Sequence, residues 1–380
     1  MHWVTMWGNA QSTVVPSPAV YAKDITLRYP IFIPFSGKKI RITFDNFCCD
    51  EDVRIEGAYL SLGRELTDET IGDPILLTKN GSSSFIIPKG ESFTSDPIDI
   101  DLKEGTYLII SFYLKEFTKL TSGVDIVGPL SKGYYAYGNQ VLKRRLDINT
   151  SKSTSWVYFL ANIDLYTEDT NEAIICYGDS ITSQDWPDYL LLALRKAGIR
   201  NRSVVRKAIS GTRILREYTC ITYQSYGYSG YHRFEHEISS VAGAKTILIQ
   251  HGINDIIHPV GVEVNPFRPM TDLPTSEELI EGLKFYNRLC KKYHLKVYFG
   301  TLLPIYGWRT YQEFREGLKN EVNEWIRKQA CIDFEKEIGI ARNGYIQFQE
   351  DCDSGDHLHP SKEGYKRMGS LAARTLVDGL

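Results

Sequence analysis

The residues of this sequence that could do chemistry together are a serine, a histidine and an aspartate. Ser180 stands in a Gly-Asp-Ser turn after the apolar run Ala173–Tyr177, whereas Asp356 and His359 lie near the other end of the chain. A serine that attacks a carbonyl carbon needs a base to accept its proton and a carboxylate to orient that base. Together the three residues predict hydrolysis of an ester through an acyl-serine intermediate, with Ser180 as the nucleophile.

Asp356 and His359 are close enough in sequence for both side chains to lie on one side of a turn. The carboxylate can then hold one imidazole nitrogen while the other nitrogen faces the serine. Pro360 disfavours helical backbone at His359 and so helps to fix the direction of its ring. Asp353 is the alternative orienting carboxylate. His357 and His359 are spaced like a metal-binding pair, but no further set of ligands accompanies them, and we expect neither a metal nor another cofactor.

The same chemistry requires hydrogen-bond donors for the oxyanion that forms on the attacked carbonyl. We expect these donors to be the backbone N–H groups of Ser180 and Gly211 and the side-chain amide of Asn254. Gly211 lies in the segment Ala-Ile-Ser-Gly-Thr, and Asn254 lies in Gln-His-Gly-Ile-Asn-Asp. Each segment directly follows an apolar run, so each is predicted to begin where a strand ends. Asp179 and Asp255 are expected to support these turns.

Two further residues are candidates for contact with substrate. His251 precedes the oxyanion segment, although a packed histidine at a strand end is an equal alternative. Tyr228 belongs to a tyrosine-rich stretch that either forms an aromatic rim for a sugar or acyl chain or is an ordinary loop. The tyrosines of this stretch are Tyr218, Tyr223, Tyr226, Tyr228 and Tyr231.

The second half of the chain alternates strand and helix patterns, which predicts a parallel sheet covered on both faces. The predicted strands are Ala173–Tyr177, Ser203–Ala208, Lys245–Gln250 and Leu295–Leu303. The predicted helices are Pro187–Gly198, Tyr231–Val241, Ser276–Tyr293, Tyr311–Lys328 and Ser361–Asp378, with Ser276 as a cap. Ligands bind outside the carboxyl ends of parallel strands, so the segments described above can converge on one crevice.

Residues 1–167 read as an all-β sandwich, jelly-roll-like, because short runs rich in Val, Ile, Tyr, Phe and Thr alternate with turn residues. The predicted strands are Lys38–Phe44, Val53–Leu62, Ser84–Pro88, Pro97–Leu102, Thr106–Leu114 and Trp156–Leu165. A polar linker, Thr167–Asn171, follows. The sequence therefore predicts two domains, residues 1–167 and residues 168–380.

Composition narrows the possible partners of this 380-residue chain. The net charge of −3 gives no reason to expect nucleic acid or an anionic membrane as a partner, and no apolar run approaches the ~18 residues of a membrane span. The seven cysteines are scattered and predict reduced, mostly buried thiols. The N-terminus lacks a signal-peptide pattern, which predicts a cytoplasmic protein, or a secreted one if a leader has been removed. Oligomeric state is not readable.

The segments around the predicted site resemble the SGNH (GDSL-like) hydrolase superfamily over roughly residues 172–380. Gly178-Asp-Ser180 matches the first block of that family, Gly211 the second, Gly252-x-Asn254-Asp255 the third and Asp356-x-x-His359 the fifth. This resemblance implies a flavodoxin-like, three-layer α/β/α hydrolase domain with a parallel sheet. It also implies hydrolysis of an ester through an acyl-serine without a metal.

Other segments resemble the two-domain arylesterase/acylhydrolase subgroup that is associated with xylan degradation. They are Trp3-x-x-Met6-Trp7-Gly8, Thr94–Pro97, Arg233-Phe234 and Asp353–Pro360. This resemblance implies that an acetyl or other small acyl group is removed from a small-molecule or polysaccharide ester.

The sequence also departs from the family pattern. Arg206 and Ala208 stand around the positions where the second block usually has Asn and Gly, which puts the shape of that loop in doubt. Gly178-Asp-Ser-Ile-Thr182 ends in threonine, so the Gly-x-Ser-x-Gly elbow of α/β-hydrolases is absent. Three alternative functions remain: a lysophospholipase or thioesterase for longer acyl chains, a non-catalytic glycan-binding protein, and a metallophosphoesterase.

Overall fold

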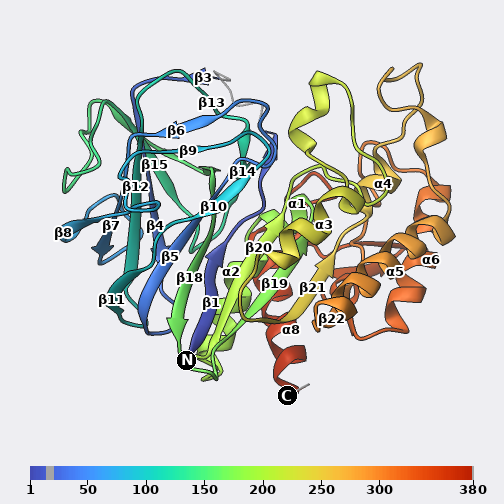
Figure 1. Cartoon of the computed structure of the whole chain (residues 1–380). Helices are drawn as coiled ribbons and strands as arrows, with labels where there is room; N and C mark the ends of the chain where they lie inside the picture. Colours follow the sequence, from blue (N-terminus) through green and yellow to red (C-terminus); the bar gives the residue numbers. More distant parts are fainter. Residues whose placement is uncertain (14–20, 379–380) are drawn as a thin grey trace. The chain divides into compact units, whose positions relative to one another are not determined.

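The computed structural model of the chain describes residues 1–13 and 21–378 (Figure 1). Internal contacts group these residues into two compact units. The first contains Met1–Ala173 together with Arg200–Val205 and Val241–Gly243, and the second contains the rest of the described chain. A single boundary at residues 167 and 168 stays a prediction.

The N-terminal part consists mostly of antiparallel strands, as the sequence predicted. One sheet has the order β1 (His2–Gly8), β18 (Leu160–Thr167), β5 (Gly37–Asp45) and β10 (Ser92–Thr94), with β11 (Ile98–Leu102) also on β5. The larger sheet has the order β16 (Ser151–Thr154), β15 (Gly133–Tyr137), β4 (Ile25–Phe32), β12 (Tyr107–Leu114), β7 (Gly57–Gly63) and β8 (Ile71–Leu76). The jelly-roll order stays a prediction.

Short strands form the remaining small sheets of this part. They are β2 (Ser12–Thr13), β14 (Ser122–Asp125) and β17 (Trp156–Tyr158) in one sheet, with the pairs β3 (Tyr21–Ala22)–β13 (Thr118–Lys119) and β6 (Val53–Ile55)–β9 (Phe85–Ile87). The two main sheets share an aromatic core, where the ring of Phe44 on β5 meets that of Phe112 on β12 edge-on at 5.4 Å.

Two predicted strands are each divided in the structure. The predicted strand Val53–Leu62 is β6 and β7, which separate at Glu56. The predicted strand Trp156–Leu165 is β17 and β18, because Phe159 adopts a φ of +60° that extended backbone does not allow.

The second half contains a five-stranded sheet in the order β20-β19-β21-β22-β23. Its strands are β19 (Glu172–Gly178), β20 (Arg202–Ala208), β21 (Ala244–Gln250), β22 (Lys296–Gly300) and β23 (Cys331–Ile332). β22 runs parallel to both β21 and β23. This strand order is the flavodoxin-like order, in which the chain reverses direction across the sheet beside the first strand. Ser180 therefore follows the strand at the switch point.

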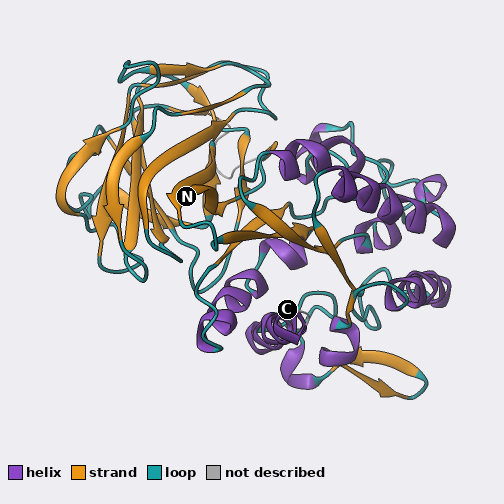
Figure 2. Ribbon diagram, turned by 60° about the horizontal axis from the view of Figure 1, so that its bottom comes forward, coloured by secondary structure: helices purple, strands orange, loops and turns teal. Residues whose placement is uncertain are grey.

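Helices cover both faces of this sheet (Figure 2). They are α1 (Ser180–Ser183), α2 (Trp186–Lys196), α3 (Gly230–Ser239), α4 (Ile253–Ile257), α5 (Ser276–Lys292), α6 (Glu313–Arg327), α7 (Phe334–Ile338) and α8 (Lys362–Asp378). Three 3₁₀ turns and a hairpin complete the part that the structure describes: η1 (Ile221–Tyr226), η2 (Met270–Asp272), η3 (Glu350–Cys352), and β24 (Gly339–Arg342) with β25 (Tyr345–Phe348). None of the described helices is both long enough and apolar enough to cross a membrane.

The start of α5 corrects one sequence prediction. Ser276 was expected to cap this helix, but the capping residue is Thr275. Its hydroxyl accepts the N–H of Glu278 at 3.2 Å, and the Glu278 carboxylate accepts the N–H of Thr275 at 2.8 Å. Both bonds satisfy donors that a helix start leaves free, which a serine one position later cannot do.

A buried ion cluster joins α6 to α7. The ammonium group of Lys319 is fully buried and lies 2.9 Å from the Glu316 carboxylate and 2.5 Å from the Glu335 carboxylate. The other Glu335 oxygen accepts hydrogen bonds from Asn323 at 3.0 Å and from Arg327 at 2.8 Å. Removing one member would leave a buried charge without its partner, which costs about 3–5 kcal/mol.

We therefore expect Lys319→Ala to lower the free energy of unfolding by about 3–5 kcal/mol, measured by urea denaturation. Lys336→Ala on α7 is the control, because Lys336 is exposed and lies outside the cluster. Similar losses in the two variants would show that the cluster adds no stability of its own.

Candidate active site

A chain of hydrogen bonds connects the three residues that sequence spacing selected. The hydroxyl of Ser180 lies 2.9 Å from Nε2 of His359, and Nδ1 of His359 lies 2.7 Å from a carboxylate oxygen of Asp356. A carboxylate accepts only, so Nδ1 carries the proton and Nε2 is free to accept from the serine hydroxyl. This is the arrangement that a serine nucleophile and its base require.

The two candidate carboxylates hold different histidines. Asp353 lies 2.5 Å from Nδ1 of His357, whereas Asp356 holds His359. His357 and His359 are therefore each paired with their own aspartate. Partial burial alone would raise the pKa of Asp356, but hydrogen bonds from the backbone and ring of His359 and from the N–H of Leu358 lower it to about 2. Asp356 thus stays ionised across the range in which enzymes work.

The turn that presents Ser180 depends on Gly178 and Asp179. A Cβ atom on Gly178 would overlap the carbonyl oxygen of Gln250 on β21, so only glycine allows the strands to come this close. Asp179 caps the following turn by accepting the N–H of Ile181 at 3.1 Å. The turn therefore fixes the position of Ser180 directly after β19, at the carboxyl end of the sheet.

The three expected oxyanion donors come from the ends of three strands. Within the described residues, the backbone N–H groups of Ser180 and Gly211 donate to no protein acceptor. Gly211 has a φ of +81°, and a Cβ atom there would overlap the ring of Tyr226. Asn254 is 3% exposed and uses one amide hydrogen to reach the carbonyl of Thr212 at 3.0 Å. Its second amide hydrogen remains for a ligand.

Asp255 fixes the loop that carries Gly211. Its two carboxylate oxygens accept the N–H groups of Ile214 at 2.8 Å and Leu215 at 3.0 Å. Burial raises the pKa of Asp255 to about 6, although these two N–H groups and Arg213 oppose the rise. The supporting role expected for Asp255 agrees with these contacts.

His251 and Tyr228 were the candidate substrate contacts. His251 is 1% exposed, and its ring lies 3.2 Å from the Thr212 carbonyl through Nε2 and 3.0 Å from the Tyr286 hydroxyl through Nδ1. Both ring nitrogens are thus occupied within the protein. The ring of Tyr228 lies against that of His232, with centroids 3.9 Å apart. A direct substrate contact by Tyr228 stays a prediction, and the placement of His251 favours a supporting position.

A family model described as "GDSL-like Lipase/Acylhydrolase" matches residues 153–372, more than half of the chain. This chain belongs to the GDSL-like lipase/acylhydrolase family. The resemblance drawn from the four sequence blocks is thereby confirmed.

The chain is also similar to solved structures. A GDSL-like lipase from Bacteroides thetaiotaomicron is 16% identical, with 56% of this chain and 92% of that chain covered and a TM-score of 0.40. An acetyl xylan esterase from Geobacillus stearothermophilus is 17% identical, with 54% and 94% covered and a TM-score of 0.40. No curated protein matches the chain.

Arg206, one of the two residues that depart from the family's second block, has defined contacts in the structure. Arg206 is 4% exposed, lies 2.7 Å from the Asp188 carboxylate and donates to the carbonyl of Ser183 at 2.8 Å. The Ser183 hydroxyl lies 3.1 Å from that of Ser210, next to Gly211. Arg206 therefore connects β20 to the turn that follows Ser180.

Several residues that lie close to His359 or Gly211 were not identified from the sequence. The ring of Trp308 meets that of His359 edge-on, with centroids 6.5 Å apart. Tyr226 was grouped only within a tyrosine-rich stretch, although its ring packs against Gly211. His258 stacks on Tyr226 with centroids 5.2 Å apart. Trp308 closely follows the predicted strand Leu295–Leu303, and this position after a strand end was the available signal for it.

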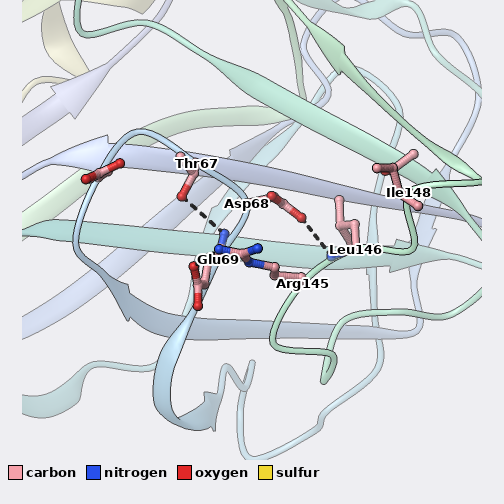
Figure 3. A pocket seen from close by; sticks show the side chains of 8 residues that line it. Thr67, Asp68, Glu69, Arg145, Leu146 and Ile148 are labelled. Carbon is pink, nitrogen blue, oxygen red and sulfur yellow. Dashed lines mark hydrogen bonds and ion pairs between the residues drawn. The ribbon is translucent and has the colours of Figure 1, made fainter.

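A hollow of about 440 Å³ lies in the first unit (Figure 3). Its walls include Thr67, Glu69 and Arg145. Glu69 pairs with Arg145 and, at 2.8 Å, with Arg144, and Asp68 accepts the N–H of Leu146 at 2.7 Å. The side chains of Asp68, Glu69 and Arg145 in this hollow are thus engaged with other groups of the protein.

The buried carboxyl of Asp179 leads to a prediction about stability and pH. Burial raises its pKa to about 7, although the Ile181 N–H and Arg233 oppose the rise. An unfolded aspartate has a pKa of about 3.9. Between these values the folded state binds the extra proton, so this group makes folding less favourable as pH rises from about 4 to about 7.

Asp179→Asn should remove that dependence, because asparagine keeps the acceptor for Ile181 without a charge. The stability of the variant relative to the native protein should rise by up to about 1.4 kcal/mol per pH unit in this range. Urea denaturation at several pH values measures it, with exposed Glu324→Gln as the control. A difference that does not change with pH would mean that Asp179 titrates like an exposed aspartate.

Proposed function

We propose that this protein is a serine esterase that removes an acetyl or other small acyl group from a carbohydrate ester through an acyl-serine. The observation that carries the proposal is the continuous path from the Ser180 hydroxyl through His359 to Asp356. Membership of the GDSL-like lipase/acylhydrolase family supports the reaction class. The sequence resemblance to the xylan-associated subgroup supports the choice of a small acyl group on a sugar.

The geometry supports the following sequence of steps. His359 Nε2 accepts the hydroxyl proton as Ser180 attacks the ester carbonyl, and Asp356 stabilises the imidazolium that results. The N–H groups of Ser180 and Gly211 and the amide of Asn254 stabilise the oxyanion. His359 then gives the proton to the leaving alkoxide. His359 then takes a proton from water, which attacks the acyl-serine. His359 gives this proton to the serine oxygen as its bond to the acyl group breaks, so the carboxylic acid is released and Ser180 is restored.

We further propose that residues 168–380 form the catalytic domain and residues 1–167 an accompanying β domain. The complete path of hydrogen bonds argues against a non-catalytic glycan-binding protein. A lysophospholipase or thioesterase differs in preferring long acyl chains, which a series of nitrophenyl esters of increasing chain length detects. Acetate release from acetylated xylan, measured beside that series, tests the carbohydrate.

Ser180→Ala should abolish labelling by a fluorophosphonate and reduce ester hydrolysis to the background rate, because no other group can form the acyl intermediate. Folding should be unchanged, since Ser180 is a half-buried turn residue. Ser239→Ala is the control, because Ser239 is an exposed serine at the end of α3 and belongs to none of the segments of the site. Mass spectrometry of the labelled protein decides the case, and an adduct on any residue other than Ser180 would contradict the proposal.

His251 should act through the oxyanion donors. Burial and the nearby Arg233 lower the pKa of His251 well below its usual value, so the ring is neutral and has one N–H. The Thr212 carbonyl can only accept, so that N–H is on Nε2, and the Tyr286 hydroxyl donates to Nδ1. Thr212 therefore receives donors from both His251 and Asn254, which fixes the position of the Asn254 amide.

We expect His251→Phe to lower kcat about tenfold with KM nearly constant, less than the ~10²–10³ lost with a direct oxyanion donor. His251→Gln should recover much of the rate, because its amide can donate near the position of Nε2. Steady-state kinetics and melting temperature are measured on each variant. A fall in melting temperature with unchanged kcat would assign His251 a role in packing alone.

A further inference from the structure

Arg268 is a buried guanidinium group that lies over tyrosine rings and has no carboxylate partner among the described residues. The residue is 8% exposed, and within the described residues its side chain donates one hydrogen bond, to the Tyr226 hydroxyl at 3.4 Å. Its Nε is buried without an acceptor. No described carboxylate lies within ion-pair distance of it. A buried charge without a partner destabilises the folded state, so this group calls for an explanation.

Other buried arginines of the same region are paired. Arg213 lies 3.0 Å from the Asp272 carboxylate and donates to the carbonyl of Arg216 at 3.1 Å. Arg315 donates to the carbonyls of Ile256 and Pro259. Arg268 differs from both, because it has neither the carboxylate partner of Arg213 nor the two carbonyl acceptors of Arg315.

Two further buried polar atoms without partners lie beside Arg268. They are Nδ1 of His258 and the hydroxyl of Tyr218. The ring centroids of these two residues are 5.9 Å apart, and the Arg268 guanidinium lies 5.9 Å from the Tyr218 ring and 4.3 Å from the Tyr223 ring. Burial first, and then the guanidinium groups of Arg268, Arg213 and Arg309, lower the pKa of His258 well below its usual value. The cluster therefore combines one unpaired positive charge with two neutral polar groups.

This cluster borders both oxyanion elements. Tyr226 separates it from Gly211, because one ring packs against Gly211 and stacks on His258. His258 follows α4 and donates its N–H to the carbonyl of Asn254 at 3.1 Å. The cluster is therefore one aromatic ring away from Gly211 and one helical turn away from Asn254.

We propose that Arg268, His258 and Tyr218 form a subsite for a carboxylate of the substrate, so that the ester is carried by an acidic sugar such as a uronic acid. This inference rests on the proposed function and names the substrate class of the same site. A guanidinium group presents two parallel N–H donors that match a carboxylate, and Tyr218 can donate to the same group.

The kinetic test compares an acetylated methyl glucuronoside that has a free carboxylate with the same compound as its carboxamide. The native protein should prefer the acid by roughly 10- to 100-fold in kcat/KM, the value of hydrogen bonds to a charged group. Arg268→Met should lower that ratio to near one. Arg216→Met removes an exposed arginine outside the cluster and should keep the ratio. Equal rates on both compounds in the native protein would overturn the inference.

A binding test separates this inference from the proposed function. Calorimetry of methyl glucuronoside with the native protein should show binding that Arg268→Met abolishes and Tyr218→Phe weakens several-fold. If the protein binds this ligand but has no esterase activity, the proposed function fails and the subsite stands. If it hydrolyses acetyl esters but binds no glucuronoside, or binds glucose 6-phosphate more tightly, the inference fails.

Stability without ligand provides the last comparison. Methionine at position 268 would replace an unpaired buried charge by an apolar side chain of similar length, so the melting temperature of Arg268→Met should equal or exceed that of the native protein. A clear fall would make Arg268 a structural cation of the tyrosine cluster and overturn the inference. Tyr218→Phe still tests ligand binding if Arg268→Met does not fold.

Discussion

The hydrogen bond between Ser180 and His359 is the interaction that the surrounding elements of the candidate site position. It joins residues 179 positions apart in the sequence, so no local preference can form it. It depends on the strand order of the sheet, which places the turn after β19 at the switch point, and on the start of α8, which fixes the segment that contains Asp356 and His359. Gly178 makes the turn possible because a side chain there would overlap β21. The serine is thus positioned by backbone packing, and the histidine by its carboxylate.

The proposed oxyanion donors depend on a second shared contact, the carbonyl of Thr212. Asn254 and His251 both lie at the end of β21, and both donate to this carbonyl in the loop after β20. Asp255 binds the next two N–H groups of the same loop. The loop that carries Gly211 is therefore fixed by the strand end that carries Asn254. A change in either segment would move both donors together, which keeps their spacing suited to one oxyanion.

Much of this arrangement could be predicted from the sequence, because it depends on local signals. Apolar runs marked β19, β20 and β21, and the turn residues after them marked the segments with chemistry. The division of Val53–Leu62 and Trp156–Leu165 was not predictable, since it depends on Glu56 leaving its strand and on the positive φ of Phe159. The sequence could not show that His251 faces Thr212, nor that Asp353 holds His357. The contact of His251 joins two segments that are far apart in the sequence, and the pairing of Asp353 with His357 depends on the local backbone of residues 353–359.

Two buried carboxyl groups affect the electrostatics around the proposed oxyanion donors. Asp179 directly precedes Ser180, and Asp255 directly follows Asn254, so two carboxyl groups lie beside the oxyanion donors. Full ionisation of both would oppose an oxyanion there. Burial raises the pKa of Asp179 to about 7, so its charge is reduced near neutral pH, whereas Asp255, with a pKa of about 6, stays mostly ionised and accepts two backbone N–H groups. The burial that fixes the turn before Ser180 thus weakens the repulsion that Asp179 would exert on an oxyanion bound by the proposed donors, and the two N–H groups bound by Asp255 offset part of its charge.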